Sequence, residues 1–328
     1  GFRSADTAPG FVNGMFGFSE NEIFAVGNGG LLMRWNGAQW SSLSDNNYLS
    51  YNGLFSLGNN QALATSLEGV ISYFDGSSWY PTYYFGRQIF SMWGTGADNL
   101  WVVGDLGGIY KYTGSSWQKQ ASKTLAALLS ISGRSPTDIW AVGLDESGGK
   151  YLHFDGSAWA TVPIPASFVP IHVWDSGADD VWFVGLDAAI LKYSRSTNSL
   201  VSFSMANNID MNTVWGSSAS DVWMAGFRAD TAQGNAAVLL HWDGKILTAL
   251  APEGFSQNDS IDTIWGLGPN DVWASGPAIL AHYDGVKWTR NYGLGSTLRA
   301  FVNTAPPGSP PELLAAGLDG AILRRRAR

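Results

Sequence analysis

The stretch that decides the fold is DIWAVG at residues 138–143, followed by FDGSAW at residues 154–159. Close copies of both phrases return along the chain, so the sequence is built from internal repeats. The third residue of the first phrase marks each copy, and consecutive marker residues are 38 to 50 positions apart. The marker residues are Phe24, Leu63, Trp101, Trp140, Trp182, Trp223, Trp273 and Leu314. The chain therefore contains eight repeats of about 41 residues.

Each repeat divides into four pieces of strand length. In the seventh repeat, the apolar residues 262–266 end in a turn at residues 267–270, and residues 271–276 follow as the second piece. A third piece ends in Asp284-Gly285, a strong hairpin signal, and a fourth begins near Trp288. Four short antiparallel strands in such a repeat are typical of a propeller blade. We therefore predict an all-β fold, an eight-bladed β-propeller of four-stranded antiparallel blades, with residues 1–328 as a single domain.

The two ends of the chain predict how the ring closes. The eighth repeat has strand-like pieces at residues 298–302, 313–317 and 321–326, but no fourth piece. Residues 2–8 precede the first repeat and have no place in it. Pairing of residues 2–8 beside the C-terminal piece would complete the last blade and leave no open sheet edge.

Composition excludes several other classes of protein. Gly accounts for 40 of 328 residues and charged residues for only 14%, whereas soluble domains average about 25% charged residues. The glycines show no three-residue period, and turn-forming residues outnumber helix formers, so collagen and helical bundles are excluded. No apolar run approaches the roughly 18 residues that cross a bilayer, and we expect no membrane span. The absence of Cys excludes disulfides and thiolate chemistry.

Charge argues against a nucleic-acid partner. The net charge is −8, whereas nucleic-acid binding requires a basic patch. One basic cluster lies at the C-terminus, from Arg324 to Arg326 with Arg328, and no aromatic residues are interleaved with it. A frayed or strand-forming tail explains this cluster better.

The repeat phrases resemble the tryptophan-rich β-propeller repeats of many exported bacterial proteins, and the resemblance covers essentially the whole chain. The turns at residues 74–79 and 154–159 are also similar to the Asp-box of sialidase-like and photosystem-assembly propellers, with one residue fewer between Asp and Gly. This resemblance implies the fold and an extracellular, cell-surface or periplasmic location. It implies little about activity, because one propeller fold serves many functions.

The recurrent His and Trp residues are predicted to be structural. Three of the four histidines share one repeat position, and such positions lie too far apart around a ring to bind one metal ion. We expect them in cross-strand pairs: Asp138 with His153, Asp221 with His241, Asp271 with His282 and, likewise, Asp180 with Lys192. The tryptophans expected to pack between neighbouring blades are Trp101, Trp140, Trp182, Trp223 and Trp273, followed by Trp40, Trp79, Trp117, Trp159 and Trp288.

No catalytic or cofactor motif is present. The sequence has no Gly-x-Ser-x-Gly, Walker loop, His-Glu-x-x-His or EF-hand pattern, and its glycine pairs do not complete a dinucleotide fingerprint. We therefore predict no cofactor, no metal ion and no catalytic residue, and the sequence favours a protein that is not an enzyme.

One face of the predicted ring has individual loops. The two longest loops between second and third strands, residues 144–149 and 227–236, emerge on the same face as the links between blades. Acidic residues follow six second strands and could form a rim, either as ordinary solvated turns or as a site for a cation or polar ligand. The rim residues are Glu68, Asp105, Asp145, Glu146, Asp187, Asp230 and Asp319.

Aromatic and basic residues complete this candidate site. Residues 80–87 are interpreted as a tyrosine-rich link between blades, and Tyr48 and Tyr51 precede another first strand; burial between blade edges is the alternative. His172 lies in a first strand, where it could face the channel. The predicted ligand-binding residues are Tyr51, Tyr83, Tyr84, Arg87, Asp105, His172, Asp187, Arg228 and Arg299, with tyrosines as stacking platforms and Arg87 and Arg299 as clamps for anions or hydroxyls.

The sequence thus predicts a non-enzymatic binding module of an exported bacterial protein. Its partner would be a glycan or an exported protein, recognised through the face with individual loops. One alternative is a glycan-active hydrolase or lyase that uses carboxylates of the same face, about 5–10 Å apart, with Arg87, Arg228, His172 or Arg299 nearby. A second alternative is a structural assembly subunit.

Overall fold

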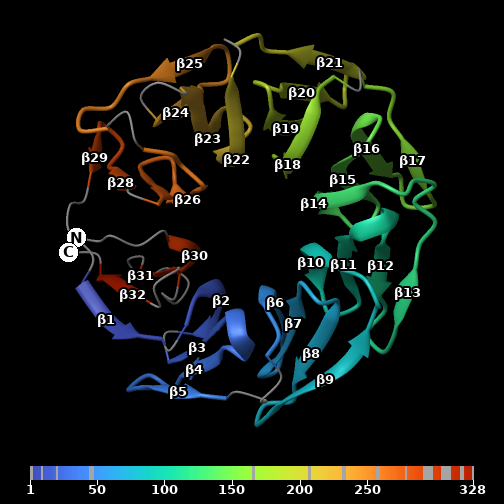
Figure 1. The fold of residues 1–328 in the computed structure, drawn as a ribbon, viewed down its shortest axis with the longest axis vertical. Coiled ribbons are helices and arrows are strands. Elements are labelled where there is room, and N and C mark those ends of the chain that lie inside the picture. Colours follow the sequence, from blue (N-terminus) through green and yellow to red (C-terminus); the bar gives the residue numbers. More distant parts are fainter. Residues whose placement is uncertain are drawn as a thin grey trace.

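The computed structural model describes residues 3–8, 10–19, 21–43, 48–164, 167–205, 208–230, 234–255, 259–277, 279–290, 298–303, 312–317 and 321–326. These residues contain 32 strands in eight separate four-stranded antiparallel sheets, which surround a central opening (Figure 1). They also contain two 3-10 turns, η1 (Asn28–Gly30) and η2 (Asp105–Gly107), and no α-helix. The predicted eight-bladed β-propeller is confirmed.

Seven blades follow the chain order from the opening outward. Blade 1 contains β2 (Val12–Ser19), β3 (Glu22–Gly27), β4 (Leu32–Trp35) and β5 (Trp40–Ser42); blade 2 contains β6 (Tyr51–Gly58), β7 (Gln61–Ser66), β8 (Val70–Phe74) and β9 (Trp79–Tyr84). Blade 3 contains β10 (Ile89–Gly96), β11 (Asn99–Gly104), β12 (Ile109–Tyr112) and β13 (Trp117–Lys119); blade 4 contains β14 (Ala127–Ser135), β15 (Asp138–Asp145), β16 (Gly148–Phe154) and β17 (Trp159–Thr161). Blade 5 contains β18 (Val169–Asp175), β19 (Asp180–Leu186), β20 (Ile190–Ser194) and β21 (Ser199–Ser202). Blade 6 contains β22 (Ile209–Ser218), β23 (Asp221–Asp230), β24 (Gly234–Trp242) and β25 (Leu247–Leu250); blade 7 contains β26 (Thr263–Gly268), β27 (Asp271–Gly276), β28 (Ile279–Tyr283) and β29 (Trp288–Arg290).

The eighth blade joins the two ends of the chain. It contains β30 (Leu298–Asn303), β31 (Glu312–Gly317) and β32 (Ala321–Arg326), and β1 (Arg3–Thr7) pairs antiparallel with β32 as its outer strand. The predicted closure is therefore confirmed for the described residues, and Phe2 and Arg328 lie outside them. The basic C-terminal cluster is a strand through Arg326, as one of its two interpretations required.

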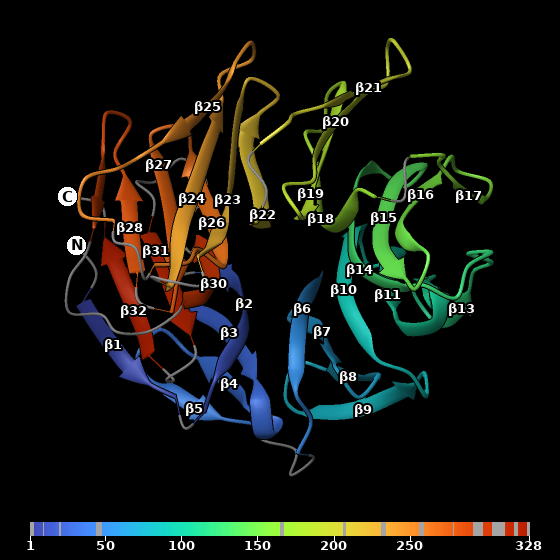
Figure 2. The same cartoon turned by 45° about the horizontal axis from the view of Figure 1, so that its top comes forward.

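The strand order gives the ring two faces. The links between blades and the loops from second to third strands lie on one face, which we call the linker face. The two other classes of loop lie on the opposite face, the turn face. Figure 2 shows the ring tilted, with first strands such as β6 and β10 beside the opening and β9 and β13 on the outer wall.

The core lies in the seams between blades. Trp101, Trp140, Trp182, Trp223 and Trp273 are at most 1% exposed, and each packs in a cluster with residues of the following blade. This confirms their predicted role. The four predicted cross-strand pairs also form, with N···O distances of 2.9 Å for Asp138 and His153, 2.7 Å for Asp221 and His241, 2.8 Å for Asp271 and His282, and 3.3 Å for Asp180 and Lys192. No helix in the described part of the chain is long and apolar enough to span a membrane.

Candidate functional site at the mouth of the central channel

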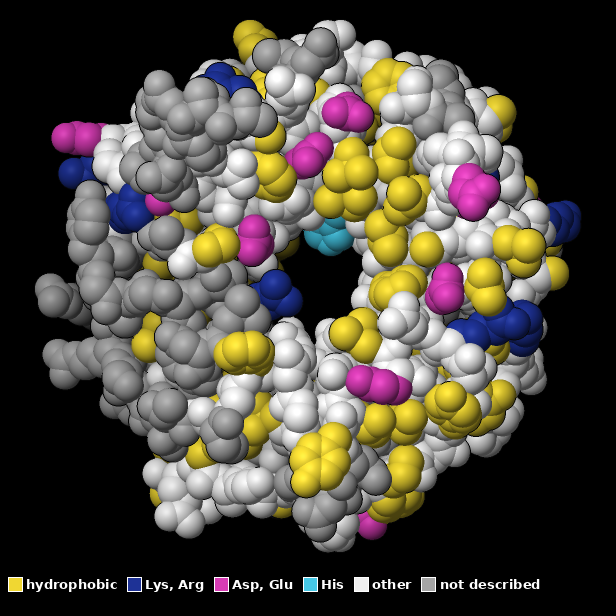
Figure 3. Space-filling model, in the orientation of Figure 1, with side chains coloured by type: hydrophobic (Ala, Val, Ile, Leu, Met, Phe, Trp, Pro, Cys, Tyr) yellow, Lys and Arg dark blue, Asp and Glu magenta, His cyan; other side chains and the backbone are white. Residues whose placement is uncertain are grey.

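The central channel holds the largest described cavity, with a volume of about 560 Å³. First strands from around the ring line it, and its polar lining includes His172, Asp262 and Arg299. Figure 3 shows basic and histidine atoms inside the opening on the face in view. Two of the predicted site residues, His172 and Arg299, thus meet in one cavity.

A repeated irregularity builds the mouth of this cavity. Seven first strands contain a β-bulge near their start, where one residue is extra relative to the second strand, and Asp262 occupies the same place directly before β26. First strands begin at the linker face, so the extra residues surround the mouth of the channel on that face. We call them the bulge ring: Asn13, Asn52, Phe90, Leu129, Ile171, Asn212, Asp262 and Arg299.

Five neighbouring blades, from 6 through 8 and 1 to 2, supply a polar arc of the bulge ring. Its three amides bridge adjacent blades: the Nδ2 atoms of Asn13, Asn52 and Asn212 donate to the carbonyls of Tyr51 (2.8 Å), Ile89 (2.7 Å) and Ile261 (3.0 Å). The Asn residues therefore stabilise the ring and also keep this side of the mouth polar.

Asp262 and Arg299 carry the charges of the bulge ring and belong to adjacent blades. Burial raises the pKa of the Asp262 carboxyl, and the positive charge of Arg299 opposes this rise. Arg299 is exposed and forms no ion pair with a described residue. Its guanidinium is therefore available to a ligand, as the sequence predicted.

His172 lies one residue beyond the ring position in β18. The corresponding residues of other first strands are small, such as Gly14, Ser91 and Thr213. The His172 Nδ1 accepts a hydrogen bond from the Val214 N–H at 3.1 Å, much as the Ser130 Oγ accepts one from the Val173 N–H at 3.2 Å. Burial lowers the pKa of His172 to about 4, so the imidazole is neutral near pH 7. Its main role is to join blades 5 and 6.

Blades 3, 4 and 5 supply an apolar arc of the bulge ring. Phe90, Leu129 and Ile171 are half-buried there, and Leu106 and Leu125 are 46% and 76% exposed on the neighbouring loops. Figure 3 shows hydrophobic side chains gathered on the side of the opening near β10, β14 and β18. The mouth is therefore polar on one side and apolar on the other.

The predicted acidic rim forms separate turns. The Glu68 Oε2 accepts from the Ser50 N–H at 2.9 Å, and the Asp105 Oδ1 accepts from the Leu106 N–H at 2.8 Å. Lys150 lies 2.8 Å from Asp145 and, with hydrogen bonds from Ser147, lowers the pKa of Asp145 to about 2. Among the described side chains, no three acidic or His residues gather in a way that could hold a metal ion. The side chain of Asp230 and the whole of Asp319 lie outside the described part.

The predicted tyrosine platform does not assemble at the mouth. Tyr51 is fully buried, and its hydroxyl is 2.8 Å from the Ser72 Oγ, so it offers no stacking surface. Residues 79–84, interpreted in part as a link, form the outer strand β9. Tyr83 and Tyr84, which are 40% and 68% exposed, therefore lie on the outer wall of blade 2.

The other predicted residues spread over the linker face. Arg87 is half-buried in the link from blade 2 to blade 3, and Asp105 begins η2. Asp187 is exposed in the next such loop but one, and its N–H donates to the Asp210 Oδ1 at 3.0 Å. Arg228 is exposed near the end of β23. The structure thus brings together His172 and Arg299 and leaves the others apart. Aligning the first strands would have revealed the missed ring residues, because each precedes the conserved spacing to its second strand by the same offset.

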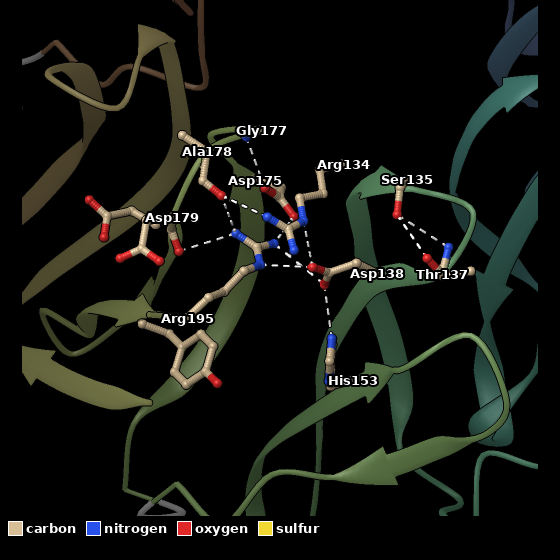
Figure 4. A network of polar contacts seen from close by, with 12 residues as sticks. Arg134, Ser135, Thr137, Asp138, His153, Asp175, Gly177, Ala178, Asp179 and Arg195 are labelled. Atoms are coloured by element: carbon tan, nitrogen blue, oxygen red, sulfur yellow. Dashed lines mark hydrogen bonds and ion pairs between the residues drawn. The ribbon is translucent and has the colours of Figure 1, made fainter. Parts of the chain in front are cut away.

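Figure 4 shows a polar network on the turn face that the sequence did not predict. The Arg195 Nε lies 2.8 Å from the Asp138 Oδ2, while its Nη2 pairs with Asp175. Arg134 and His153 also contact Asp138, at 2.7 and 2.9 Å. Burial opposes ionisation of Asp138, but hydrogen bonds from His153 and Arg195 outweigh it and lower its pKa, whereas burial raises the pKa of Asp175. The network ties blade 4 to blade 5 and faces away from the channel mouth.

Comparison with known proteins supports the fold. No protein-family model and no curated protein matches the sequence. Three similar solved structures are YCF48 bound to D1 peptide (TM-score 0.61, 15% identity, 100% of this chain and 95% of that chain), virginiamycin B lyase from Staphylococcus aureus (0.63, 12%, 85% and 95%) and Sqt1 from Saccharomyces cerevisiae (0.72, 10%, 100% and 98%). At such low identity these likenesses show the fold alone. The chain is an eight-bladed β-propeller with a two-sided channel mouth on its linker face.

Proposed function

We propose that this propeller is a non-enzymatic binding module that holds a segment of a partner polypeptide over the bulge ring. The observation that carries the proposal is the division of the ring into a polar and an apolar arc. A polypeptide segment presents apolar side chains together with backbone donors and acceptors, so it can satisfy both arcs at once. A rigid ring with individual loops is a common basis for binding sites.

The charges of the mouth refine this proposal. Arg299 is exposed and unpaired within the described residues, whereas Asp262 is half-buried beside it. A carboxylate of the partner could pair with Arg299, which provides several donors in a planar fork. One neighbour, YCF48, is described as bound to a peptide, which supports the general use of this fold for polypeptides.

The glycan-active enzyme has weaker support. Two carboxylates about 5–10 Å apart would be needed. Among the described residues that line the central cavity, Asp262 is the one carboxylate. A glycan as a passive partner, and a purely structural subunit, remain alternatives that the experiment below separates.

We further propose that the chain belongs to the exported tryptophan-rich propellers of bacteria. The support is the repeat phrases, the absence of Cys and a charged fraction of only 14%. Fractionation of the source cells should place the native protein in the periplasm, at the surface or in the medium. Recovery in the cytosol alone would contradict this location.

A selection experiment tests the binding function. The immobilised protein is screened with a displayed random-peptide library and, in parallel, with a glycan array. Selected peptides are then titrated against Arg299→Glu, which reverses the ring charge, and Phe90→Asn, which copies the residue type of Asn52 in the apolar arc. Lys287→Glu provides a charge-matched control on the turn face.

The proposal expects each ring variant to weaken peptide binding at least about tenfold, which corresponds to 1.4 kcal/mol, with no effect of Lys287→Glu. Melting temperatures show whether the variants remain folded. Peptides that bind all variants equally would disprove the site. Selection of glycans without peptides would favour the glycan alternative.

A further inference from the structure

A second pocket lies on the outer wall, in the seam between blades 2 and 3. It has a volume of about 300 Å³ and is lined by Leu63, Tyr73, Tyr80, Tyr83, Tyr112 and Trp117, together with three hydroxyl-bearing residues. None of its lining residues belongs to the channel cavity. An inference from this pocket therefore does not depend on the function proposed for the channel mouth.

The pocket lies where other seams hold an indole ring. Leu63 is the marker residue of blade 2 and pairs with Tyr73, just as Trp140 of blade 4 pairs with His153. In the seam of blades 4 and 5, the Trp140 ring contacts the Tyr193 ring at a centroid distance of 5.0 Å. Tyr112 occupies the position of Tyr193 in blade 3. Leu63 is too small to reach this far, so an indole-sized space remains open.

The same relation holds in other seams. Trp223 of blade 6 lies 5.0 Å from Tyr283 and 5.3 Å from Trp288 of blade 7, and Trp101 of blade 3 lies 5.7 Å from Trp159 of blade 4. Trp117 is the residue of blade 3 that corresponds to Trp159 and Trp288. The surfaces that grip an indole elsewhere are thus present at the pocket.

The walls of the pocket are held in place by further aromatic contacts. Tyr73 meets Tyr80 edge-on at 5.5 Å, and Tyr112 lies 5.1 Å from Trp117. Phe85 packs at 4.6 Å from Tyr83 and at 5.5 Å from Trp117. A ligand would therefore meet preformed surfaces, which reduces the entropic cost of binding.

The outer strand of blade 2 keeps the pocket open to solvent. β9 has six residues, whereas the outer strands β5, β13, β17, β21, β25 and β29 have three or four. A register shift places Thr82 outside the regular pairing with β8. Tyr80 and Tyr83 are 41% and 40% exposed at the entrance. Aromatic side chains exposed together in this way are a common mark of a binding site.

The pocket is uncharged. No lining residue is acidic or basic, and burial raises the pKa of Tyr73 and of Tyr112, so both hydroxyls are protonated at neutral pH. The Tyr112 hydroxyl donates to the Gly114 carbonyl at 2.9 Å, and its oxygen can still accept a hydrogen bond. Such an acceptor suits a neutral ligand with one N–H group.

We propose that this pocket receives an indole, presented as a tryptophan side chain by a partner polypeptide. The space corresponds to the tryptophan of the repeat, the walls are aromatic, and a hydroxyl oxygen is available to the indole N–H. Tryptophan anchors of this kind often dominate protein–protein affinity. A sugar ring or a proline would use the aromatic walls without matching the shape of the missing indole.

The test uses N-acetyl-tryptophanamide as a neutral probe, titrated against the whole protein by ligand-observed NMR. N-acetyl-prolinamide and methyl glucoside are titrated in parallel as competing chemistries. Leu63→Trp fills the space from inside, Tyr80→Ala removes one wall, and Tyr84→Ala is the matched control. Tyr84 belongs to the same strand and is 68% exposed, but it does not line the pocket.

We expect saturable binding of the tryptophan probe, at least about tenfold weaker in Leu63→Trp and in Tyr80→Ala, and unchanged in Tyr84→Ala. Arg299→Glu should leave this binding unchanged, which separates the pocket from the channel mouth. Absence of saturable binding, equal binding by Leu63→Trp, or preference for prolinamide or glucoside would overturn the proposal. If Leu63→Trp does not fold, Tyr80→Ala decides the outcome.

Discussion

The seam between blades 4 and 5 and the seam between blades 2 and 3 are built from the same repeat positions but differ in how they are filled. In the first, Trp140 contacts Phe183 and Tyr193, and the Arg195 network ties the same blades together on the turn face. In the second, Leu63 replaces the tryptophan and a pocket remains. No ion pair joins these two blades among the described residues.

The difference separates stability from recognition. A propeller needs most seams filled, because its blades have no other core. Once several seams are filled by Trp, one seam can remain open without loss of the ring. The repeat therefore supplies both the stable scaffold and, where it departs from its pattern, a candidate site.

The largest expected effect is the loss of the filled seam. Trp140→Ala should lower the free energy of unfolding by about 3–5 kcal/mol, because it removes a buried ring and leaves a cavity. Denaturant unfolding measures the change, with Tyr84→Ala as an exposed aromatic control. A loss below about 1 kcal/mol would show that the indole contributes little to the seam.

The next effect concerns the ionic part of the same seam. Arg195→Met should cost about 2–4 kcal/mol, because Asp175 stays buried without its cation while Asp138 keeps Arg134 and His153. Arg134→Met is the matched control. Its side chain is 40% exposed, so its loss should cost less than about 1 kcal/mol. Equal costs for the two variants would contradict the assigned role of Arg195.

A third effect concerns pH at the seam between blades 5 and 6. An unfolded His protonates near pH 6.5, whereas burial lowers the pKa of His172 in the folded state to about 4. As pH falls through this window the unfolded state takes up more protons, so the stability of the fold decreases with decreasing pH. The decrease should reach about 2–3 kcal/mol near pH 4, at 1.36 kcal/mol per pKa unit with some allowance for water in the channel.

His172→Ser should remove most of this dependence. A serine hydroxyl can accept the Val214 N–H bond, as Ser130 accepts the bond from Val173. Unfolding curves of both proteins between pH 7 and about pH 4 would provide the comparison. A variant that keeps the full slope would show that other groups cause it.

The sequence predicted the features that repeat locally. The strands, the closure by β1 and the Asp–His pairs follow from patterns within one or two repeats, and the structure confirms them. The Arg195 network was missed because Arg195 and Asp138 are 57 residues apart in turns of different blades, where no local pattern links them. Pro81 suggested a link between blades, but an outer strand tolerates proline on its free edge. Tyr51 takes the first-strand position of the buried Val12 and Ile89, so alignment of the repeats could have predicted its burial.

The smallest effect should come from filling the open seam. Leu63→Trp restores the repeat residue, and we expect a gain of about 1 kcal/mol in the free energy of unfolding, as is common for cavity filling. The new indole would enter between Tyr112 and Trp117, in the arrangement that Trp223 has with Tyr283 and Trp288. Urea unfolding of the variant and the parent protein measures the difference.

The sign of this change decides between two views of the open seam. If the space matches an indole, the variant gains stability, and the Gln61 side chain could accept the new N–H as Asn99 accepts that of Trp101 at 2.9 Å. If the surrounding tyrosines have instead adapted to Leu63, the larger ring will be overpacked and cost about 1–3 kcal/mol. A gain would show that the scaffold retains the geometry of the repeat and leaves the space to a ligand. A loss would show that the seam has evolved its own packing, and the comparison with the seam of blades 4 and 5 would no longer predict what the pocket binds.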